Sequence, residues 1–322
     1  MPRVLIGAAT LRSVDGAYRQ VLGDAGYEIV FPTVVRQMSE DEILVELKDI
    51  DAVLAGSEPY TSRVLDANPQ LKVIARNGVG YDAIDVAACT ARGVAVTISP
   101  ANQEAVAEHT LMLMLAVAKG LVTQHNAVRA GAWTRYATQP LRGRTLGLAG
   151  LGRIGRAVAE RALAFGMRVI AHEPYPDGAF VAKHSIPLVS LEDLFAQADF
   201  VSLHMPLTPE SRGAVGATLL GRMKPSSYLI NTARGPIIDE CALYDALANK
   251  RIAGAGLDVF ENEPPVGCPL LGLDNVVLTA HTAGVDTRSG EEMSHLAAQT
   301  IVKYLRGEWP KGVVVNPEVR KK

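Results

Sequence analysis

The chain has almost no excess of either charge and no block of basic residues. Among its 322 residues, 32 lysines and arginines nearly balance 34 aspartates and glutamates, which gives a formal net charge of -2 at pH 7. Nucleic acids and anionic membranes bind proteins chiefly through clustered positive charge. We therefore expect no nucleic-acid partner and no membrane partner, and we interpret the basic residues 320–322 as a solvated end.

Cysteine and long apolar runs are also scarce. The three cysteines, Cys89, Cys241 and Cys268, lack the spacing of metal ligands, and an odd number suits a disulfide framework poorly. We expect no metal site and a reducing cytoplasm, in which thiols stay free. The most apolar run, residues 110–118, is too short to span a bilayer, so we interpret it as a buried helix. No leader-like segment precedes the strand-like residues 4–6.

Short apolar runs alternate with helical patterns along most of the chain. Buried strands of parallel sheets read as such runs, so the alternation predicts an α/β fold. Residues 101–130 interrupt it with two expected helices, at 104–119 and 121–129, and a last helix is expected at about 288–306. The strand candidates lie at residues 4–6, 52–55, 73–75, 94–96, 146–149, 168–171, 200–203, 228–231, 254–259 and 276–279.

The change of pattern near residue 100 predicts two lobes, and the usual length of about 150 residues per domain favours the same number. We expect one lobe from residues 1–99 plus 285–322 and a second from residues 100–284. Both are expected to be Rossmann-like or flavodoxin-like, with parallel sheets. The active site is expected in the cleft between them, at the carboxyl ends of the strands. A capping-box spacing at Ser39 and Glu42 predicts the start of a helix in the first lobe.

A glycine fingerprint, Gly150-x-Gly152-x-x-Gly155, follows the strand candidate 146–149 and opens a helical pattern. In this setting Gly150 allows a tight turn, Gly152 lets the backbone approach a pyrophosphate, and Gly155 lets the helix pack closely on the strand. The amides at the start of the helix then face the negative charge of the phosphates. We predict a dinucleotide site at this turn.

Glu173 indicates which dinucleotide binds there. It ends the next strand, 18 positions beyond Gly155, where a carboxylate accepts hydrogen bonds from the adenosine ribose. Its charge would repel a 2′-phosphate. The sequence therefore predicts NAD as the cofactor, bound by the lobe of residues 100–284.

Three residues at or near strand ends suit the reduction of a carbonyl group. Arg234 follows the strand candidate 228–231, and its guanidinium can hold a carboxylate with two parallel hydrogen bonds. His281 follows another strand candidate and titrates near neutral pH, so it can give and take a proton. His204 also ends a strand and rivals it. Glu263 would favour the protonated imidazole of a neighbouring histidine, but Glu261 is an equal candidate because spacing alone does not separate the two.

These residues lie within a longer series of motifs through which the chain resembles the D-isomer-specific 2-hydroxyacid dehydrogenase family, and most of all its phosphoglycerate dehydrogenase branch. The similarity covers nearly the whole chain. The segments that carry it are Gly78-Val79-Gly80-Tyr81-Asp82, Ala107-Glu108-His109-Thr110, Gly150-Leu151-Gly152-Arg153-Ile154-Gly155, His204-Met205-Pro206-Leu207-Thr208, Asn231-Thr232-Ala233-Arg234-Gly235, Asp258-Val259-Phe260-Glu261-Asn262-Glu263-Pro264 and Ala280-His281-Thr282-Ala283-Gly284.

The resemblance implies a role for each of these positions. Arg234 would anchor the substrate, Glu263 would be the partner carboxylate and His281 the acid and base, which decides both open choices. Asp258 and the backbone near Ala233 would hold the nicotinamide amide. The turn from Pro206 to Thr208 would line the adenine and ribose. The full cofactor-binding set implied in this way is Gly150, Gly152, Arg153, Ile154, Gly155, Glu173, His204, Pro206, Thr208, Ala233, Asp258, His281 and Gly284.

The substrate is expected to meet the first lobe at Val79 and Gly80. The family pattern implies their amides as donors to the substrate carboxylate, and two adjacent amides beside glycines also make a small anion nest on physical grounds. A phosphorylated substrate is less favoured, because Glu58 stands where an arginine would be expected in the phosphoglycerate enzymes. Arg76, with Arg135 from a neighbouring subunit, would compensate.

The resemblance thus implies an NAD-dependent D-2-hydroxyacid dehydrogenase that moves hydride between nicotinamide and C2 of a small 2-hydroxy or 2-oxo acid. It further implies a homodimer formed through residues 101–130, and a short form without the regulatory domain of longer members. Two alternatives stay open. One is an NAD-sensing, corepressor-like binding protein, and the other is a phosphite or formate dehydrogenase.

Overall fold

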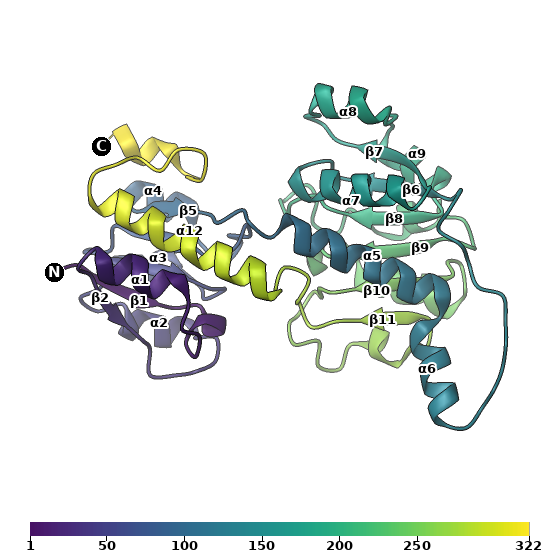
Figure 1. Ribbon diagram of the computed structural model, residues 1–322, viewed down its shortest axis with the longest axis horizontal. Coiled ribbons are helices and arrows are strands. Elements are labelled where there is room, and N and C mark those ends of the chain that lie inside the picture. Colours follow the sequence, from purple (N-terminus) through teal and green to yellow (C-terminus); the bar gives the residue numbers. More distant parts are fainter. Residues whose placement is uncertain (322) are drawn as a thin grey trace. The chain divides into compact units, whose positions relative to one another are not determined.

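The computed structural model describes residues 1–321 and divides the chain into two compact units (Figure 1). Unit 1 comprises residues 1–102 and the chain from Val285 onward, and unit 2 comprises residues 103–284. Each unit contains one sheet whose strands all run parallel. The predicted fold class, two parallel α/β lobes, is confirmed.

Unit 1 is built on a five-stranded sheet in the order β2-β1-β3-β4-β5. Four of these strands match the candidates read from the sequence, but β2 was not predicted. It is only three residues long and lies at the edge of the sheet, and none of its side chains is fully buried, although Ile29, Val30 and Phe31 form a short apolar run. The strands are β1 (Arg3–Ile6), β2 (Glu28–Val30), β3 (Ala52–Ala55), β4 (Val73–Arg76) and β5 (Ala95–Thr97).

The two faces of this sheet are covered by different helices. Successive side chains of a strand point to opposite faces, and along β1 Val4 and Ile6 pack with helices α1 and α12 while Leu5 packs with the helices of the other face. Figure 1 shows α1 and α12 side by side on one face. The first face carries α1 (Ala17–Asp24) and α12 (Thr287–Leu305), and the second carries α2 (Glu40–Glu46), α3 (Ser62–Ala67) and α4 (Val86–Arg92).

Helix α2 begins with the predicted capping box. The Ser39 hydroxyl accepts a hydrogen bond from the Glu42 amide at 3.4 Å, and a Glu42 carboxylate oxygen accepts one from the Ser39 amide at 2.8 Å. Two amides that have no partner within the helix are thus satisfied, and loss of such a cap costs about 1 kcal/mol.

Unit 2 has a six-stranded sheet in the order β11-β10-β9-β8-β6-β7. The chain leaves β6 toward β7 on one side and then crosses to β8 on the other, so the order reverses between β6 and β8. Ligands of open α/β sheets bind at such a switch point. All six strands were predicted: β6 (Thr145–Ala149), β7 (Arg168–His172), β8 (Phe200–Leu203), β9 (Tyr228–Asn231), β10 (Gly254–Leu257) and β11 (Val276–Leu278).

Helices cover both faces of this sheet as well. One face packs against α5 and α7 and the other against α9, α10 and α11 (Figure 1). Helix α5 buries most of the apolar run at residues 110–118, as predicted, whereas α6 has no buried residue. The helices are α5 (Gln103–Lys119), α6 (Leu121–Arg129), α7 (Arg153–Ala164), α8 (Gly178–His184), α9 (Leu191–Gln197), α10 (Ala217–Leu220) and α11 (Glu240–Ala248).

Four short 3-10 turns complete the described chain: η1 (Ala9–Leu11), η2 (Gly235–Ile237), η3 (Pro269–Gly272) and η4 (Pro317–Lys321). Within the described residues no helix by itself has both the length and the apolar composition to cross a membrane. Helices α5 and α6 meet the test only when joined, and the chain bends by 60° between them.

Candidate cofactor and active site

The glycine fingerprint forms the turn between β6 and α7, at the switch point of the unit 2 sheet. Gly150 has φ +105°, and a Cβ atom there would lie 2.7 Å from the carbonyl carbon of His204, which follows β8. A Cβ atom at Gly155 would lie 2.3 Å from the Gly150 carbonyl oxygen. Both positions therefore exclude any side chain, and they bring the helix, the turn and β8 into close contact.

Gly152 differs from these two positions, because a Cβ atom built on it meets no atom within 4 Å. It is the residue that precedes α7, and Arg153 and Ile154 form the first turn of that helix. A turn with open space above its middle glycine, followed by the free amides of a 12-residue helix, is a cradle that fits a pyrophosphate. The residues present thus fit the NAD predicted from the sequence.

Glu173 is held beside this cradle by the backbone. One of its carboxylate oxygens accepts a hydrogen bond from the Leu151 amide at 2.9 Å, and the other accepts one from the Tyr175 amide at 3.0 Å. Each oxygen keeps a lone pair for a further donor. The carboxylate is therefore fixed next to the glycine turn, where it can accept ribose hydroxyls and would repel a 2′-phosphate.

The loop after β8 follows the same turn. The His204 amide donates to the Ala149 carbonyl at 2.7 Å, and the ring Nε2 lies 2.9 Å from the Ser202 hydroxyl. Burial lowers the pKa of His204 to about 4, so this ring is neutral near pH 7. Further along, the Ser211 hydroxyl accepts from the Thr208 amide at 2.7 Å and donates to the Pro206 carbonyl at 2.7 Å, which closes the turn at residues 206–211.

Arg234 lies in a loop after β9 that is braced from inside. The buried Asn231 side chain donates to the Arg234 carbonyl at 2.9 Å and accepts from the Ala233 amide at 3.0 Å. At Gly235 a Cβ atom would come within 1.9 Å of the Phe260 carbonyl carbon, so the loops after β9 and β10 touch through their backbones. The backbone of Arg234 is therefore held by its own loop and by the neighbouring loop after β10.

His281 and Glu263 form a short hydrogen bond. The His281 Nδ1 donates to the Glu263 Oε2 at 2.6 Å, and the Glu263 Oε1 accepts from the Phe260 amide at 3.1 Å. The imidazole is about half exposed, with 48% of its side chain accessible, so its other nitrogen is not enclosed by the protein. Glu261, the competing carboxylate, lies 3.9 Å from Arg212 instead.

The charge state of Glu263 follows from its neighbours. Burial by itself would raise the pKa of this carboxyl group, but the hydrogen bond and charge of His281, together with the Phe260 amide and the charge of Arg234, outweigh burial and lower the pKa. Glu263 is therefore ionised at neutral pH and accepts the Nδ1 proton. The three loops after β9, β10 and β11 bring Arg234, Glu263 and His281 to the carboxyl edge of one sheet.

Asp258 lies beneath this group and is almost completely buried. Its carboxylate accepts hydrogen bonds from the Thr279 hydroxyl at 2.5 Å and from the amides of Thr282 and Ala283 at 2.9 Å each. His109 of α5 reaches the same group, a contact that sequence reasoning missed. The helical pattern places residue 109 on a buried helix, but no local signal indicates which loop its side chain meets.

Unit 1 carries the remaining predicted residues at the carboxyl edge of its own sheet. Gly78 has φ +142°, and its carbonyl accepts from the Ser99 amide at 2.8 Å, which ties the turn containing Val79 and Gly80 to the end of β5. The Arg76 Nη2 lies 3.5 Å from the Ser57 hydroxyl. The anion nest proposed at Val79 and Gly80 needs no side chain, because backbone amides supply its hydrogen-bond donors.

Glu58 lies in the same region but faces the interior. Only 1% of it is exposed, and its Oε2 accepts hydrogen bonds from the Gly56 amide at 2.7 Å and the Tyr60 hydroxyl at 3.3 Å. Its position therefore makes this carboxyl group a support of the loop after β3. Across residues 1–321, the structure contains no group of three or more His, Cys, Asp or Glu side chains arranged to hold a metal ion.

Comparison with known proteins agrees with this site. Residues 111–283 match the family model of the D-isomer specific 2-hydroxyacid dehydrogenase, NAD binding domain. A glyoxylate reductase from Korarchaeum cryptofilum is 41% identical over 293 residues, which cover 88% of each chain. A D-3-phosphoglycerate dehydrogenase from Methanocaldococcus jannaschii is 40% identical over 291 residues, but this chain spans only 56% of its length.

The likeness extends to solved structures. D-Lactate dehydrogenase from Aquifex aeolicus, complexed with NAD and lactic acid, superposes with a TM-score of 0.86 at 30% identity, and the match covers 98% of this chain and 99% of that one. Sequence and structure thus agree over nearly the whole length. The chain belongs to the D-isomer specific 2-hydroxyacid dehydrogenase family and is an NAD-dependent oxidoreductase that acts on CH–OH groups.

Proposed function

We propose that this dehydrogenase interconverts a small 2-oxo acid and its D-2-hydroxy acid, with His281 as the proton donor and acceptor. The observation that carries the proposal is the 2.6 Å hydrogen bond between His281 and the ionised Glu263, beside the loop of Arg234. A half-exposed imidazole with one nitrogen held by a carboxylate is arranged to exchange a proton at the other.

Each residue has a distinct task in the reduction. The Arg234 guanidinium binds the substrate carboxylate. In unit 1, the amides of Val79 and Gly80 are donors suited to a carboxylate as well. When bound, the nicotinamide supplies the hydride for C2. Because Glu263 occupies Nδ1, the proton reaches the new C2 oxygen from Nε2 of His281, and the Glu263 charge stabilises the ring while it is protonated.

The cofactor is held by the residues around the glycine turn. The amides that begin α7 bind the pyrophosphate and Glu173 accepts the ribose hydroxyls. Ala233 precedes Arg234 in the chain, and the Asp258 carbonyl accepts a hydrogen bond from the His281 amide. In this proposal Asp258 and the backbone at Ala233 would contact the carboxamide of the nicotinamide ring. The turn from Pro206 to Thr208 lines the site of the adenine and its ribose. His204, whose ring is neutral, precedes this turn.

We further propose that the substrate carries no phosphate. The relative matched over most of its length is named glyoxylate reductase, whereas the matched phosphoglycerate dehydrogenases are about twice as long as the matching region. In unit 1, the side chain behind the loop after β3 is the buried carboxyl group of Glu58, which offers a phosphate no positive charge. Arg76 is a cation at this edge that would favour a phosphate. Turnover of 3-phosphohydroxypyruvate therefore tests directly whether a phosphorylated acid is accepted.

The test is NADH oxidation by the purified protein with a panel of 2-oxo acids. The panel contains glyoxylate, pyruvate, hydroxypyruvate, 3-phosphohydroxypyruvate, sulfopyruvate and bulkier branched acids. Turnover with a preference for a small unphosphorylated acid supports the proposal, and a preference for the phosphorylated acid corrects its substrate. Tight NADH binding without turnover of any acid would instead support an NAD-sensing protein.

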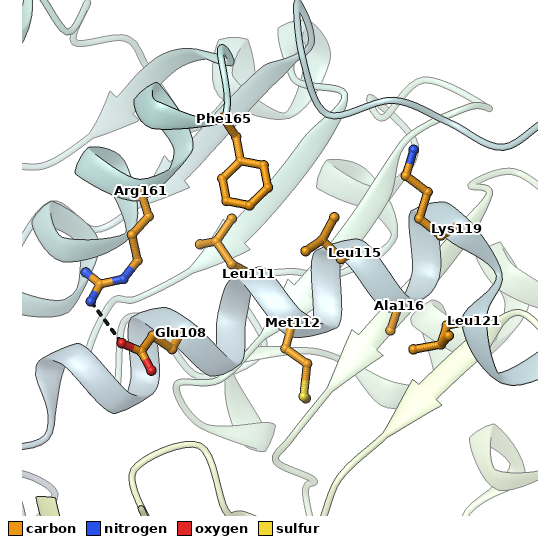
Figure 2. Close-up of a pocket in the computed structure, with 9 residues that line it drawn as sticks. All are labelled: Glu108, Leu111, Met112, Leu115, Ala116, Lys119, Leu121, Arg161 and Phe165. Carbon is orange, nitrogen blue, oxygen red and sulfur yellow. Dashed lines mark hydrogen bonds and ion pairs between the residues drawn. The ribbon is translucent and has the colours of Figure 1, made fainter. Parts of the chain in front are cut away.

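We propose that the protein is a homodimer joined through α5, α6 and the neighbouring end of α7. Helix α6 buries none of its residues in the single chain and exposes Leu121, Val122 and Val128. A nine-residue helix is unstable in water without tertiary packing, so this helix needs a covering surface. Beside it lies a cavity of about 550 Å³ with mostly apolar walls, shown in Figure 2.

A second copy of this chain suits that surface, because in a two-fold interface the same surface supplies both the cavity and the side chains that fill it. Met112 and Phe165 at the cavity are 44% and 45% exposed, and Leu121 from α6 is 58% exposed. Light scattering should give the mass of two chains, and Leu121→Glu should reduce it to one. A monomeric wild-type protein would reject the dimer.

We also propose a cellular compartment for the protein, on the basis of its cysteines. All three cysteines are free thiols, and one of them is exposed. Free thiols persist in reducing compartments. We therefore place the protein in the cytoplasm.

A further inference from the structure

We propose that His109 of helix α5 is a positioning residue that, through Thr279 and Asp258, holds the loop carrying His281 in its working conformation. The proposal rests on the proposed role of His281. It assigns a task to a side chain that lies on a different element, more than 160 positions earlier in the chain.

The number of protons on the three groups determines which of them donates in each hydrogen bond. The His109 Nε2 lies 2.9 Å from the Thr279 hydroxyl oxygen, and that hydroxyl lies 2.5 Å from the Asp258 Oδ1. A threonine hydroxyl has a single proton, which goes to the carboxylate because an ionised carboxylate can only accept. The His109 Nε2 must then carry a proton and donate it to Thr279. The same nitrogen lies 3.4 Å from Asp258, so its N–H group faces both oxygens.

Asp258 transmits this contact to the active-site loop. Its Oδ1 also accepts from the Thr282 amide and its Oδ2 from the Ala283 amide, while its backbone carbonyl accepts from the His281 amide at 2.8 Å. Three consecutive amides are thus held by one residue. The orientation of the Asp258 carboxylate decides where those amides lie, and Thr279, with His109 behind it, holds the same Oδ1 atom that accepts from Thr282.

The backbone of His281 needs such support. Its φ is +53°, in the left-handed region that is strained for a non-glycine residue. A conformation of this kind persists only where surrounding contacts determine it. In this loop the contacts are the three hydrogen bonds to Asp258 and the bond from the ring to Glu263.

The next residue of the helix makes an equivalent contact with the Arg234 loop. The Thr110 hydroxyl donates to the Val106 carbonyl at 2.8 Å, so at 3.0 Å it accepts the proton of the Thr232 hydroxyl. Thr232 comes two positions before Arg234. Two consecutive residues of one buried helix therefore contact the loops of Arg234 and His281, so the same helix helps to position both loops.

The experiment compares His109→Leu with His109→Gln. Leucine removes the N–H donor and keeps an apolar side chain, whereas the glutamine amide can donate from nearly the same distance along the side chain. The matched control is His295→Leu on α12, which removes a partly buried helical histidine whose Nε2 lies 2.8 Å from Gln299 in unit 1. For each variant we would measure kcat, KM, NADH affinity, the melting temperature and the hydrogen exchange of the peptide containing residues 279–284.

We expect His109→Leu to lower kcat by roughly 10- to 100-fold, the scale of a small misplacement of reacting groups. Exchange should accelerate in the 279–284 peptide but not in β6 or α7. His109→Gln should restore most of both properties, and His295→Leu should alter neither.

Three results would overturn the proposal: unchanged kcat and exchange in His109→Leu, equal loss in both His109 variants, or faster exchange throughout unit 2. The equal loss would assign His109 to packing alone. The exchange readout does not depend on turnover. A wild-type protein without dehydrogenase activity would therefore refute the proposed function while the support of the loop was still measured.

Discussion

Two strands of the unit 2 sheet, β8 and β11, are each followed within three residues by a histidine. The two rings differ in their exposure to solvent and in their hydrogen-bond partners. His204 after β8 is partly buried, its Nε2 lies 2.9 Å from the Ser202 hydroxyl, and desolvation lowers its pKa to about 4. His281 after β11 is half exposed and donates to an ionised carboxylate. Residue type and position in the sheet are shared, so the difference comes from the surrounding loops.

This comparison teaches that a strand end provides only a place for chemistry. Burial removes the charged state of His204 from the range near neutral pH and leaves it as a neutral packing and hydrogen-bonding group. His281 instead stays half exposed, with its Nδ1 hydrogen-bonded to an ionised carboxylate. The next four changes either break the contrast between the two rings or sharpen it.

Replacing the exposed ring should have the largest effect. His281→Ala removes the group that protonates the substrate oxygen, and we expect kcat for reduction to fall by about 10²- to 10⁴-fold with NADH affinity nearly unchanged. Steady-state kinetics with NADH titration by fluorescence measures both quantities. An unchanged kcat would break the comparison and move the proton transfer to another group.

Arg234→Lys tests whether the site beside His281 needs more than a positive charge. An ammonium group cannot reproduce two parallel hydrogen bonds to a carboxylate, so kcat/KM should fall by roughly 10- to 100-fold although the charge is conserved. The loss should appear for every 2-oxo acid in the panel, because all of them share the carboxylate. If kcat/KM stays at the wild-type value, the guanidinium is not the substrate anchor.

Glu263→Gln should make His281 more like His204 by removing its carboxylate partner. In the wild-type protein the pKa of Glu263 is lowered, so the carboxylate stays ionised as the pH falls below its ordinary range and favours the protonated ring. Without that charge the protonated ring, which reduction needs, loses its partner carboxylate, so the activity of reduction should fade earlier as the pH rises. The pH profile of kcat/KM measures this, and an unmoved alkaline limb would reject the pairing.

His204→Gln should have the smallest effect on the chemistry. The ring is neutral near pH 7, so its loss does not remove a charged proton donor from the reaction. We expect the pH profile to stay in place and the change to appear as a few-fold weaker binding of NADH, because the backbone and Cβ atom of this residue lie against the glycine turn. A displaced pH profile in this variant, with normal NADH affinity, would show that the two rings are more alike than the structure indicates.

Much of the fold could be predicted because its signals are local. Ten strand candidates follow from apolar runs, and the capping box at Ser39 and Glu42 follows from spacing. β2 escaped prediction because it is a three-residue edge strand that begins with the exposed Glu28, and the short apolar run at residues 29–31 was not recognised as a strand. The interior position of Glu58 was equally hidden, since a charged residue after a strand gives no sign that a loop folds over it.

The site was less accessible to sequence reasoning. Spacing alone could not choose between Glu261 and Glu263, because which carboxylate faces His281 depends on how the loop after β10 bends against the β9 loop. The family resemblance named Glu263, and the structure brings Glu263 to His281. His109 had no signal of any kind, since a contact across many residues is fixed only when the helix packs on the sheet.

The split of unit 1 between the two ends of the chain has a consequence for biosynthesis. One face of its sheet is covered by α1 together with α12, whose Ala297, Ala298 and Ile301 belong to the same core as Val4 and Ile6. A ribosome makes those strands first and α12 only after all of unit 2. The nascent first lobe must therefore wait with an uncovered apolar face, while unit 2 has every residue of its core as soon as it leaves the exit tunnel, so the NAD-binding half can mature first.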